Sequence, residues 1–568
     1  MTRQSTVDRV HAAYRRIRGL DRPEIWITLR DEGEVLVESA AIDARLAAGE
    51  SLPLAGLLAG VKDNIDVAGL PTTAAAPSFL YRPVDDATAV QRLREAGALV
   101  IGKTNLDQFA TGLVGSRSPY GAVRNAWDPA RISGGSSSGS AVAVALGLVD
   151  VALGTDTAGS GRVPAALNGV IGWKATRGLI PTTGVVPACR SLDCVTVFAR
   201  ELGLAKRTAD LLSGPDGADP LARTTVEREA LTPASGSPAR SRVAIPTPEH
   251  LTGLADGWTE AFRQAVERLR ASGVDVMEVD IAPLLQTSRM LYEGAFVAER
   301  YAAVGAHIAA HRDLIGTGLD ASVAAIILAG AEPSAVELYR DRETLDGLAR
   351  AADRVLEGCD ALLTPTTTWH PTFEELTVDP IDGNSRLGRF TNFANLLDLT
   401  SVAVPAGTVD GLPFGVMFTA AAFHDEGVGQ LAQRLLAPAL DILVVGAHLS
   451  DQPLNHQLVA AGGSLAGPVL TAPEYALFAL DTTPAKPGLV RVGAGGASIA
   501  GEVWSLPAAG FGGFVAALPQ PMTIGRVTLS DGRTVSGFLC ETIATDGAED
   551  ITGHGGWLSW LGSSRSVL

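Results

Sequence analysis

Cysteine is scarce in this sequence, with four residues among 568. The four thiols are those of Cys189, Cys194, Cys359 and Cys540. They form no C-x-x-C pair and have no spacing typical of zinc ligands, which argues against a disulfide-linked scaffold and a zinc ribbon. We therefore expect reduced thiols in the core of a cytoplasmic protein.

Basic residues are also few, because 45 Lys and Arg face 62 Asp and Glu, for a formal net charge of −17. Nucleic acids and anionic membranes bind clustered Lys and Arg, so neither is expected as a partner. Long apolar runs are missing too. Residues 141–149, the most apolar stretch, are far shorter than the roughly 20 residues of a membrane-spanning helix. The N-terminal segment has no apolar signal core, so we expect a soluble protein.

The first part of the chain alternates helical and strand-like patterns. ATAVQRLREAGA (87–98) has apolar residues at helical spacing, and ALVIGKT (98–104) predicts a short buried strand. SAVAVALGLV (140–149) predicts a buried helix of small residues, and DVALGTD (150–156) predicts the strand after it. This alternation favours an α/β fold.

The same alternation resumes after a polar segment rich in Pro, Gly and Ser at residues 213–242, which predicts a surface excursion. RVAIPTP predicts a strand, and WTEAFRQAVERLRASG predicts a helix whose buried face carries Trp258, Phe262, Val266 and Leu269. VDVMEVD predicts the next strand. One large α/β domain is therefore expected over residues 1–440.

The remaining residues, 441–568, predict a smaller β-rich domain. ALFALDT, GLVRVG and SIAGEVWSL are typical of strands. In TIGRVTLSDGRTVSGFLCE, Asp531-Gly532 separates two alternating apolar runs, which is a strong hairpin signal.

Two Gly- and Ser-rich segments attract attention as candidate sites. SGGSSSGSA (133–141) contains Ser136, and GTDTAGSGRVPAA contains Ser160 between two glycines. Glycines beside a serine allow a tight turn and close approach of a substrate. Consecutive N–H groups in such a loop can stabilise an oxyanion. Ser137, Ser138 and Ser140 are expected to form local hydrogen bonds.

A serine nucleophile needs a base, and histidine is absent between His11 and His250. Lys62, in the mostly apolar segment AGVKDNIDVAG, is the candidate. Desolvation lowers the pKa of a lysine and so lets it act as a base near neutral pH.

Lys62, GGSSSGSA and GTDTAGSGR, in this order, resemble the amidase signature family over roughly residues 25–435. The resemblance implies a central mixed sheet flanked by helices and a Ser–cis-Ser–Lys triad. In it Ser160 is the nucleophile, and Ser136, after a cis peptide bond, relays the proton to Lys62. The implied oxyanion hole consists of the N–H groups of Thr157, Ala158 and Gly159, with that of Ser160.

Within the family, RPEIWITLRDE, TNLDQFATGLVGSRSPYG and GRFTNFANLLDLTSVAVPAG resemble the allophanate hydrolase subgroup. The substrate-binding Tyr and Arg of that subgroup match Tyr292 and Arg300. The resemblance implies hydrolysis of allophanate (urea-1-carboxylate) to ammonia and carbon dioxide. A planar guanidinium suits its carboxylate.

The C-terminal segment resembles the additional domain of that subgroup, which has a γ-glutamylcyclotransferase-like fold. Its implied role is to promote decarboxylation of N-carboxycarbamate. His448 in VVGAHLSDQPLN and Glu502 in GEVW are the candidate residues. His456 and His554 stay open as alternatives to His448, because a histidine can direct protons in decarboxylation.

The resemblance also implies a homodimer and an outside source of allophanate, either a urea carboxylase or a cyanuric acid pathway. No Ala-Met-Lys-Met biotin segment occurs, so a carboxylase would be a separate chain. No cofactor is expected. GALVIGKT (97–104) fits the P-loop pattern, but its middle residues predict a strand. HIAAH (307–311) lacks the glutamate of the metalloprotease motif.

Two rival interpretations stay open. One is a different amide hydrolase of the same family, such as the glutaminase subunit of a transamidosome. The other is a catalytically silent amidase-like scaffold, against which the intact Lys62, Ser136 and Ser160 argue.

Overall fold

The computed structural model describes residues 5–224, 227 and 241–564. The chain divides into two compact units. The first comprises Met1–Ala265 and Val276–Gln433, and the second comprises Val266–Asp275 and Arg434–Leu568. Residues 225–226 and 228–240 of the surface excursion expected at 213–242 lie outside the described residues.

An eleven-stranded mixed sheet forms the centre of the first unit, in the order β1-β3-β2-β4-β6-β5-β10-β11-β9-β7-β8. β2 is parallel to β3 and β4, and β7 is parallel to β9. Antiparallel pairs join β4 to β6, β5 to β10 and β10 to β11. The strands are β1 (Trp26–Leu29), β2 (Leu58–Lys62), β3 (Leu99–Thr104), β4 (Val151–Asp156), β5 (Ile171–Lys174), β6 (Cys194–Ala199), β7 (Arg242–Pro246), β8 (Asp275–Val279), β9 (Ala361–Pro365), β10 (Thr400–Val409) and β11 (Leu412–Ala420).

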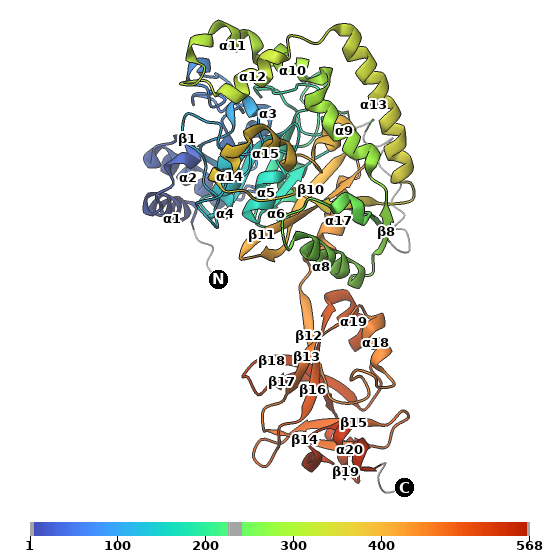
Figure 1. Ribbon diagram of the computed structural model, residues 1–568. Helices are drawn as coiled ribbons and strands as arrows, with labels where there is room; N and C mark the ends of the chain where they lie inside the picture. Colours follow the sequence, from blue (N-terminus) through green and yellow to red (C-terminus); the bar gives the residue numbers. More distant parts are fainter. Residues whose placement is uncertain (1–4, 225–226, 228–240, 565–568) are drawn as a thin grey trace. The chain divides into compact units, whose positions relative to one another are not determined.

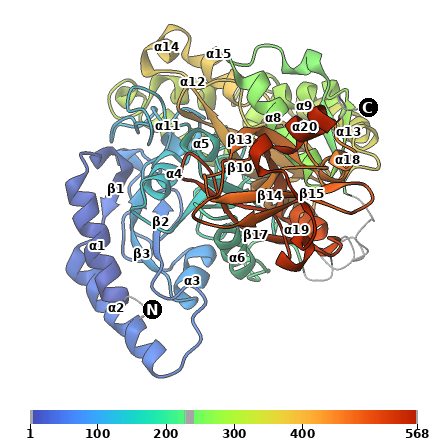
Figure 2. The same cartoon turned by 90° about the horizontal axis from the view of Figure 1, so that it is seen from below.

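Helices surround this sheet (Figure 1). α1 and α2 lie side by side in both views (Figures 1 and 2). The helices are α1 (Thr6–Gly19), α2 (Glu32–Ala47), α3 (Thr88–Glu95), α4 (Ser138–Ala145), α5 (Val163–Asn168), α6 (Leu202–Leu212), α8 (Trp258–Ala271), α9 (Ala282–Glu293), α10 (Ala298–Arg300), α11 (Ala306–Ala310), α12 (Ala321–Ala329), α13 (Ala335–Val355), α14 (Phe373–Val378), α15 (Pro380–Leu387), α16 (Asn392–Leu396) and α17 (Asp425–Leu436). The expected α/β fold is confirmed.

The predicted elements α3, β3, α4, β4, β7, α8 and β8 all form, within a few residues of the expected bounds. The P-loop-like segment is indeed the buried strand β3. The predicted apolar face of α8 is buried at all four positions, from Trp258 to Leu269. Among the described residues, no helix is both long and apolar enough to cross a membrane.

The second unit is β-rich, as expected. Its five-stranded sheet has the order β13-β16-β12-β18-β17, and a three-stranded sheet has the order β15-β14-β19. Asp531-Gly532 lies in the turn between antiparallel β17 and β18, so the predicted hairpin is confirmed. The elements are β12 (Ala439–Val444), α18 (Asn455–Ala460), β13 (Ser464–Leu470), β14 (Tyr475–Leu480), β15 (Lys486–Arg491), β16 (Ala500–Pro507), α19 (Ala508–Ala516), β17 (Met522–Thr528), β18 (Thr534–Cys540), β19 (Glu549–Asp550) and α20 (Trp557–Ser564).

Small residues let α4 pack tightly in the first unit. Every residue of the helix from Ser138 to Val144 is buried. A Cβ on Gly139 would lie 2.4 Å from the carbonyl oxygen of Ile25 and 2.6 Å from the amide nitrogen of Asn105. Since these are backbone atoms, only glycine fits.

We therefore expect Gly139→Ala to destabilise the protein by about 1–3 kcal/mol, as overpacking does. Gly427→Ala in α17 is the matched control, because a Cβ there meets nothing within 4 Å. Without a clash, replacing a helical glycine stabilises by about 0.5–1 kcal/mol. Calorimetric thermal unfolding checks both variants, and equal melting temperatures for the two would contradict the packing argument.

Candidate active site

The candidate residues of the first unit follow buried strands of its sheet. Lys62 ends β2, and the loop that carries Ser160 follows β4. Because β2 and β4 are parallel neighbours, both residues lie toward the carboxyl ends of these strands. Ligands of sheet-based α/β proteins bind at that edge.

Lys62 is fully buried and bonded only to hydroxyl and carbonyl oxygens. Its Nζ lies 2.8 Å from Ser136 Oγ and 2.8 Å from Thr155 Oγ1. No carboxylate of the described chain pairs with it directly. Burial lowers the pKa of Lys62 to about 7, although Asp107 and Asp193 at longer range act in the opposite direction. A lysine with this pKa is substantially neutral at physiological pH and can accept a proton.

The peptide bond between Gly135 and Ser136 is cis, as the family resemblance implies. A Cβ on Gly135 would come within 2.1 Å of Asp107 Oδ2 and 2.6 Å of the Gly115 nitrogen, so no side chain fits before Ser136. The Asp107 N–H donates to the carbonyl oxygen of Ser136. The Asp107 backbone is thus bonded to Ser136, and its carboxylate packs against Gly135.

The other serines of this segment form local hydrogen bonds, as expected. Ser137 Oγ donates to the carbonyl oxygen of Thr155, and Ser140 Oγ donates to that of Leu153. Ser138 Oγ donates to the carbonyl oxygen of Asn105. These hydroxyls therefore tie α4 to neighbouring segments of the fold.

A buried carboxylate shapes the loop around Ser160. Asp156 accepts from the N–H groups of Gly159 and Gly161 at 2.8 and 3.0 Å. Both of its oxygens also accept from the Arg162 guanidinium at 2.9 Å. The loop therefore wraps around one carboxylate, and Ser160, which is 2% exposed, lies between the two bonded glycines.

The N–H groups expected to form the oxyanion hole are not equally available in this structure. The N–H of Gly159 already donates to Asp156, so it could serve an oxyanion only by giving up that bond. Within the described chain, the N–H groups of Ala158 and Ser160 have no acceptor. Thr157 is held through its hydroxyl, which donates to Asp193. Burial raises the pKa of Asp193 to about 6, although the hydrogen bonds that its carboxylate accepts from Thr157 and from backbone N–H groups act to lower it.

Arg300 and Tyr292 form the second part of the site. Arg300, at the end of α10, is 1% exposed. Its guanidinium donates to the Tyr292 hydroxyl at 3.0 Å and to Thr111 Oγ1 at 2.9 Å. Its Nε has no hydrogen-bond partner among the described residues, and no carboxylate there forms an ion pair with the guanidinium. A buried cation without a counter-ion is costly, and an anionic ligand would compensate for it.

The two parts of the site meet at an apolar cluster. Ala158, next to the nucleophile candidate, belongs to a buried cluster with Cys189 and Leu291, and Tyr292 packs against this cluster. The structure thus brings the Tyr292–Arg300 pair to the serine loop. Thr111, Asp156 and Asp193 were not singled out by the sequence. Thr111 and Asp156 lie inside recognised motifs, whereas Asp193 lies outside them.

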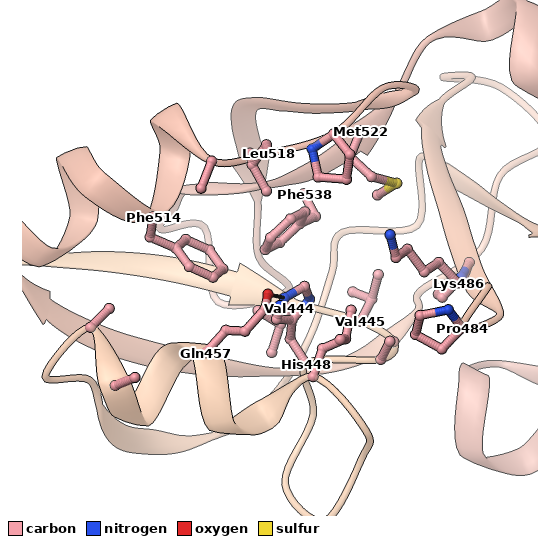
Figure 3. A pocket seen from close by; sticks show the side chains of 18 residues that line it. Val444, Val445, His448, Gln457, Pro484, Lys486, Phe514, Leu518, Met522 and Phe538 are labelled. Carbon is pink, nitrogen blue, oxygen red and sulfur yellow. Dashed lines mark hydrogen bonds between the residues drawn. The ribbon is translucent and has the colours of Figure 1, made fainter. Parts of the chain in front are cut away.

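Of the two candidate residues of the second unit, His448 and Glu502, only His448 lines a cavity. His448 lines a cavity, and its Nε2 lies 3.0 Å from Gln457 Oε1 (Figure 3). Burial lowers the pKa of His448, and the charge of Lys486 acts in the same direction. Glu502 does not line this cavity. Its carboxylate instead accepts from the N–H and hydroxyl of Ser450, and so fixes the turn after His448.

The alternatives to His448 also lie away from the cavity. His456 is exposed, and its ring is bonded to the carbonyl oxygen of Pro453. His554 is exposed near Ser563. In the first unit, the paired histidines His307 and His311 stack at 4.2 Å, and His307 Nε2 lies 3.0 Å from Ser78 Oγ.

Comparison with known proteins places the chain in a family. The amidase family model matches residues 8–428, and the model of the allophanate hydrolase C-terminal domain matches residues 440–562. The chain therefore belongs to the amidase family and is a hydrolase of that family, with this additional C-terminal domain. The predicted boundary between two domains, 1–440 and 441–568, stays a prediction.

Several individual proteins are similar to this chain over much of its length. The structure of allophanate hydrolase from Kluyveromyces lactis is 38% identical, with a TM-score of 0.71, over 99% of this chain and 97% of that one. Urea amidolyase of Lachancea kluyveri is 40% identical over 94% of this chain. The chain spans only 31% of that protein's length. The glutamyl-tRNA(Gln) amidotransferase of Symbiobacterium thermophilum has a subunit that is 34% identical over 75% of this chain and 92% of that protein.

The lowered pKa of Lys62 predicts the pH dependence of amide hydrolysis. Since only the neutral amine accepts a proton, kcat/KM should rise with pH and level off above the Lys62 pKa of about 7. Below that value the rate should fall about tenfold per pH unit. Lys62→Arg should remove about 1000-fold or more of the activity, because a guanidinium does not give up its proton. An acid limb centred below about pH 5 would exclude Lys62 as its source.

Proposed function

We propose that this chain hydrolyses allophanate, the carboxylated form of urea. The observation that carries the proposal is the buried Arg300 guanidinium, which forms no ion pair with an acidic residue of the described chain. Its partner Tyr292 packs against the apolar cluster that contains Ala158 of the Ser160 loop. Allophanate offers an amide and a carboxylate two bonds apart. An Arg fork can bind that carboxylate bidentately while the amide carbon faces the serine.

In the proposed mechanism Ser160 attacks the terminal amide carbon. Its proton passes through Ser136 to neutral Lys62, which lies 2.8 Å from the Ser136 hydroxyl. The oxyanion accepts from the free N–H groups at Ala158 and Ser160, and each such donor is worth about 100- to 1000-fold in rate. Lys62 returns the proton to the leaving nitrogen, and ammonia departs.

The acyl-enzyme then carries an N-carboxylated carbamoyl group on Ser160. Water attacks it, with Lys62 again accepting a proton through Ser136, and N-carboxycarbamate leaves. Tyr292 and Arg300 hold the free carboxylate through both steps. Thr111 holds the guanidinium from its other side, since it accepts a hydrogen bond at 2.9 Å.

The second unit would promote decarboxylation of the released N-carboxycarbamate to ammonia and carbon dioxide. His448 lines its cavity and is the preferred proton-handling group, and Glu502 supports the turn that follows it. A separate urea carboxylase would supply the substrate, consistent with the urea amidolyase relatives, whose length exceeds that of this chain. We further propose a cytoplasmic homodimer.

A glutaminase activity is the rival, since amidotransferase subunits are relatives of the first unit. Glutamine carries its carboxylate four bonds from its amide carbon, whereas the two groups of allophanate are two bonds apart. Ammonia release from allophanate, glutamine and a simple amide therefore separates the two activities. Release from glutamine alone would refute the proposal, and release from none would favour a silent scaffold.

We expect Ser160→Ala to reduce ammonia release from allophanate to background, because the change removes the hydroxyl that attacks the amide carbon in the proposed mechanism. The loss should lie in kcat, and the melting temperature should stay within a few degrees of the wild type. The matched control is Ser140→Ala, whose hydroxyl bonds to a backbone carbonyl away from the substrate. Substantial activity in the Ser160 variant would disprove its role as nucleophile.

Arg300→Ala should lower kcat/KM for allophanate by about 100-fold or more, because a charged hydrogen bond to a buried carboxylate is worth several kcal/mol. The same variant should change the hydrolysis of an uncharged amide far less. Arg340→Ala on the exposed side of α13 controls for a general loss of charge. An equal decrease in kcat/KM for both substrates would exclude a role of Arg300 in carboxylate recognition.

A further inference from the structure

Gln108 is a buried polar side chain that takes no part in the catalytic relay. It begins the loop that leads to Thr111, and it is fully shielded from solvent. Its amide nitrogen donates to the carbonyl oxygens of Ala75 and Gly318, both at 2.8 Å. Its amide oxygen accepts from the N–H of Asp320 at 2.8 Å. This one amide therefore joins the loop to two backbone segments that lie 33 and 210 positions away in the sequence.

Two of the segments beside this amide contain residues in the left-handed region of φ. Ala74 and Ala75 have φ values of 49° and 59°. Phe109 and Ala110 have φ values of 49° and 52°. Residues with a Cβ rarely adopt this region, and they keep it where the surrounding structure holds them there. The Phe109 N–H donates to the Ala74 carbonyl oxygen at 2.9 Å, and the Gln108 amide bonds to the next carbonyl along. Gln108 therefore holds both left-handed pairs in place.

This backbone conformation sets the direction of the Thr111 hydroxyl. The Thr111 N–H donates to the carbonyl oxygen of Gln108 at 3.0 Å, and Thr111 Oγ1 donates to the carbonyl oxygen of Phe109 at 3.2 Å. Since the hydroxyl proton is used in that bond, the oxygen is left to accept from the Arg300 guanidinium, which lies at 2.9 Å. The acceptor that orients Arg300 thus depends on the backbone that Gln108 holds.

A second connection reaches Arg300 through α12. Asp320, whose N–H is bonded to Gln108, also caps the N-terminus of this helix with its carboxylate. α12 packs against α10, which ends at Arg300 (Figure 1). It packs as well against the π-helix Tyr301–Gly305, which follows directly, and π-helical turns occur frequently at functional sites. Gln108 is therefore bonded both to the loop that contacts the guanidinium and to the helix that packs on the segment carrying it.

We propose that Gln108 is a positioning residue for substrate specificity, which holds Thr111 and α12 so that the Arg300 guanidinium meets the carboxylate of the substrate. That this carboxylate belongs to allophanate rests on the proposed function. All polar atoms of the Gln108 side chain are bonded to the backbone, so Gln108 acts through Arg300 and not on the substrate itself. Loss of these bonds should therefore weaken recognition of the carboxylate far more than attack by Ser160 on an uncharged amide.

Gln108→Met in the full chain tests the proposal, because methionine is of similar length and lacks the amide donors. We expect kcat/KM for allophanate to fall about tenfold, through a higher KM, and the value for malonamide, an uncharged amide, to change far less. In the Arg300→Ala background the same substitution should cause no further fall, since Gln108 acts through the guanidinium. Gln91→Met, at an exposed position of α3 where the amide bonds to Glu95, is the matched control and should behave as the wild type.

Gln108→Glu is the second variant, because it keeps the acceptor for the Asp320 N–H and loses both donors. Thermal unfolding shows whether each variant folds, and we expect a cooperative transition for at least one of them. The KM for allophanate should rise in the folded variant. Loss of the folded state in both variants would overturn the proposal, because a general structural role would then account for Gln108.

Direct binding separates this inference from the proposed function. Ser160→Ala removes the attacking hydroxyl, so calorimetric titration of that variant measures its affinity for allophanate without turnover. Adding Arg300→Ala shows how much of the affinity depends on the guanidinium, and Gln108→Met should weaken that part about tenfold. Affinity that does not depend on Arg300, unchanged affinity in the folded Gln108 variant, or additive losses for Gln108→Met and Arg300→Ala would each overturn the inference. Binding through Arg300 without ammonia release by the wild type would instead refute the proposed function.

Discussion

The buried pair of Asp156 and Arg162 is the interaction on which the rest of the first site depends. Both side chains are fully buried, so each charge needs the other. Burial acts to raise the pKa of Asp156, but the Arg162 guanidinium holds that pKa below its ordinary value. The carboxylate stays ionised and can gather two loop N–H groups around Ser160.

The same pair connects the loop to a distant part of the chain. Arg162 donates to the carbonyl oxygen of Thr391 and to Asn395 Oδ1, and Asn395 Nδ2 donates back to the carbonyl oxygen of Asp156. Thr391 in turn donates to the Ala158 carbonyl oxygen at 2.7 Å. These bonds join residues that are 229 to 239 positions apart in the sequence. The serine loop is therefore held in place by α16, which is far from it in the sequence.

Much of the fold could be predicted from local patterns. The helical spacing of apolar residues predicted which face of α8 is buried. A run of apolar residues predicted the strand β3. β13 was missed because Gly467 and Pro468 interrupt its pattern, and such residues are unfavourable in strands. β12 was missed because its apolar run lies at the predicted domain boundary. Strand order depends on contacts between distant segments, which local patterns do not contain.

The residues of the candidate site also fall into two groups, those that local sequence predicts and those that it does not. Lys62, Ser136 and Ser160 lie in short segments whose composition alone is informative. Asp193 and Thr111 act through partners distant in sequence, so no local signal marks them. Glu502 was chosen by its position in a related fold, but in this structure its carboxylate is bonded to Ser450 and Trp504 outside the cavity.

The hydrogen bond between Arg300 and Thr111 joins residues that are 189 positions apart. This separation constrains how such a pocket can arise during evolution. An arginine introduced at the end of α10 of an ancestor without a threonine in the facing loop would be buried with fewer bonds and would destabilise the fold. The threonine alone carries no such penalty. Evolution is therefore expected to introduce the threonine of the loop first and the arginine second. An engineer who transfers this specificity to another protein would move both segments together.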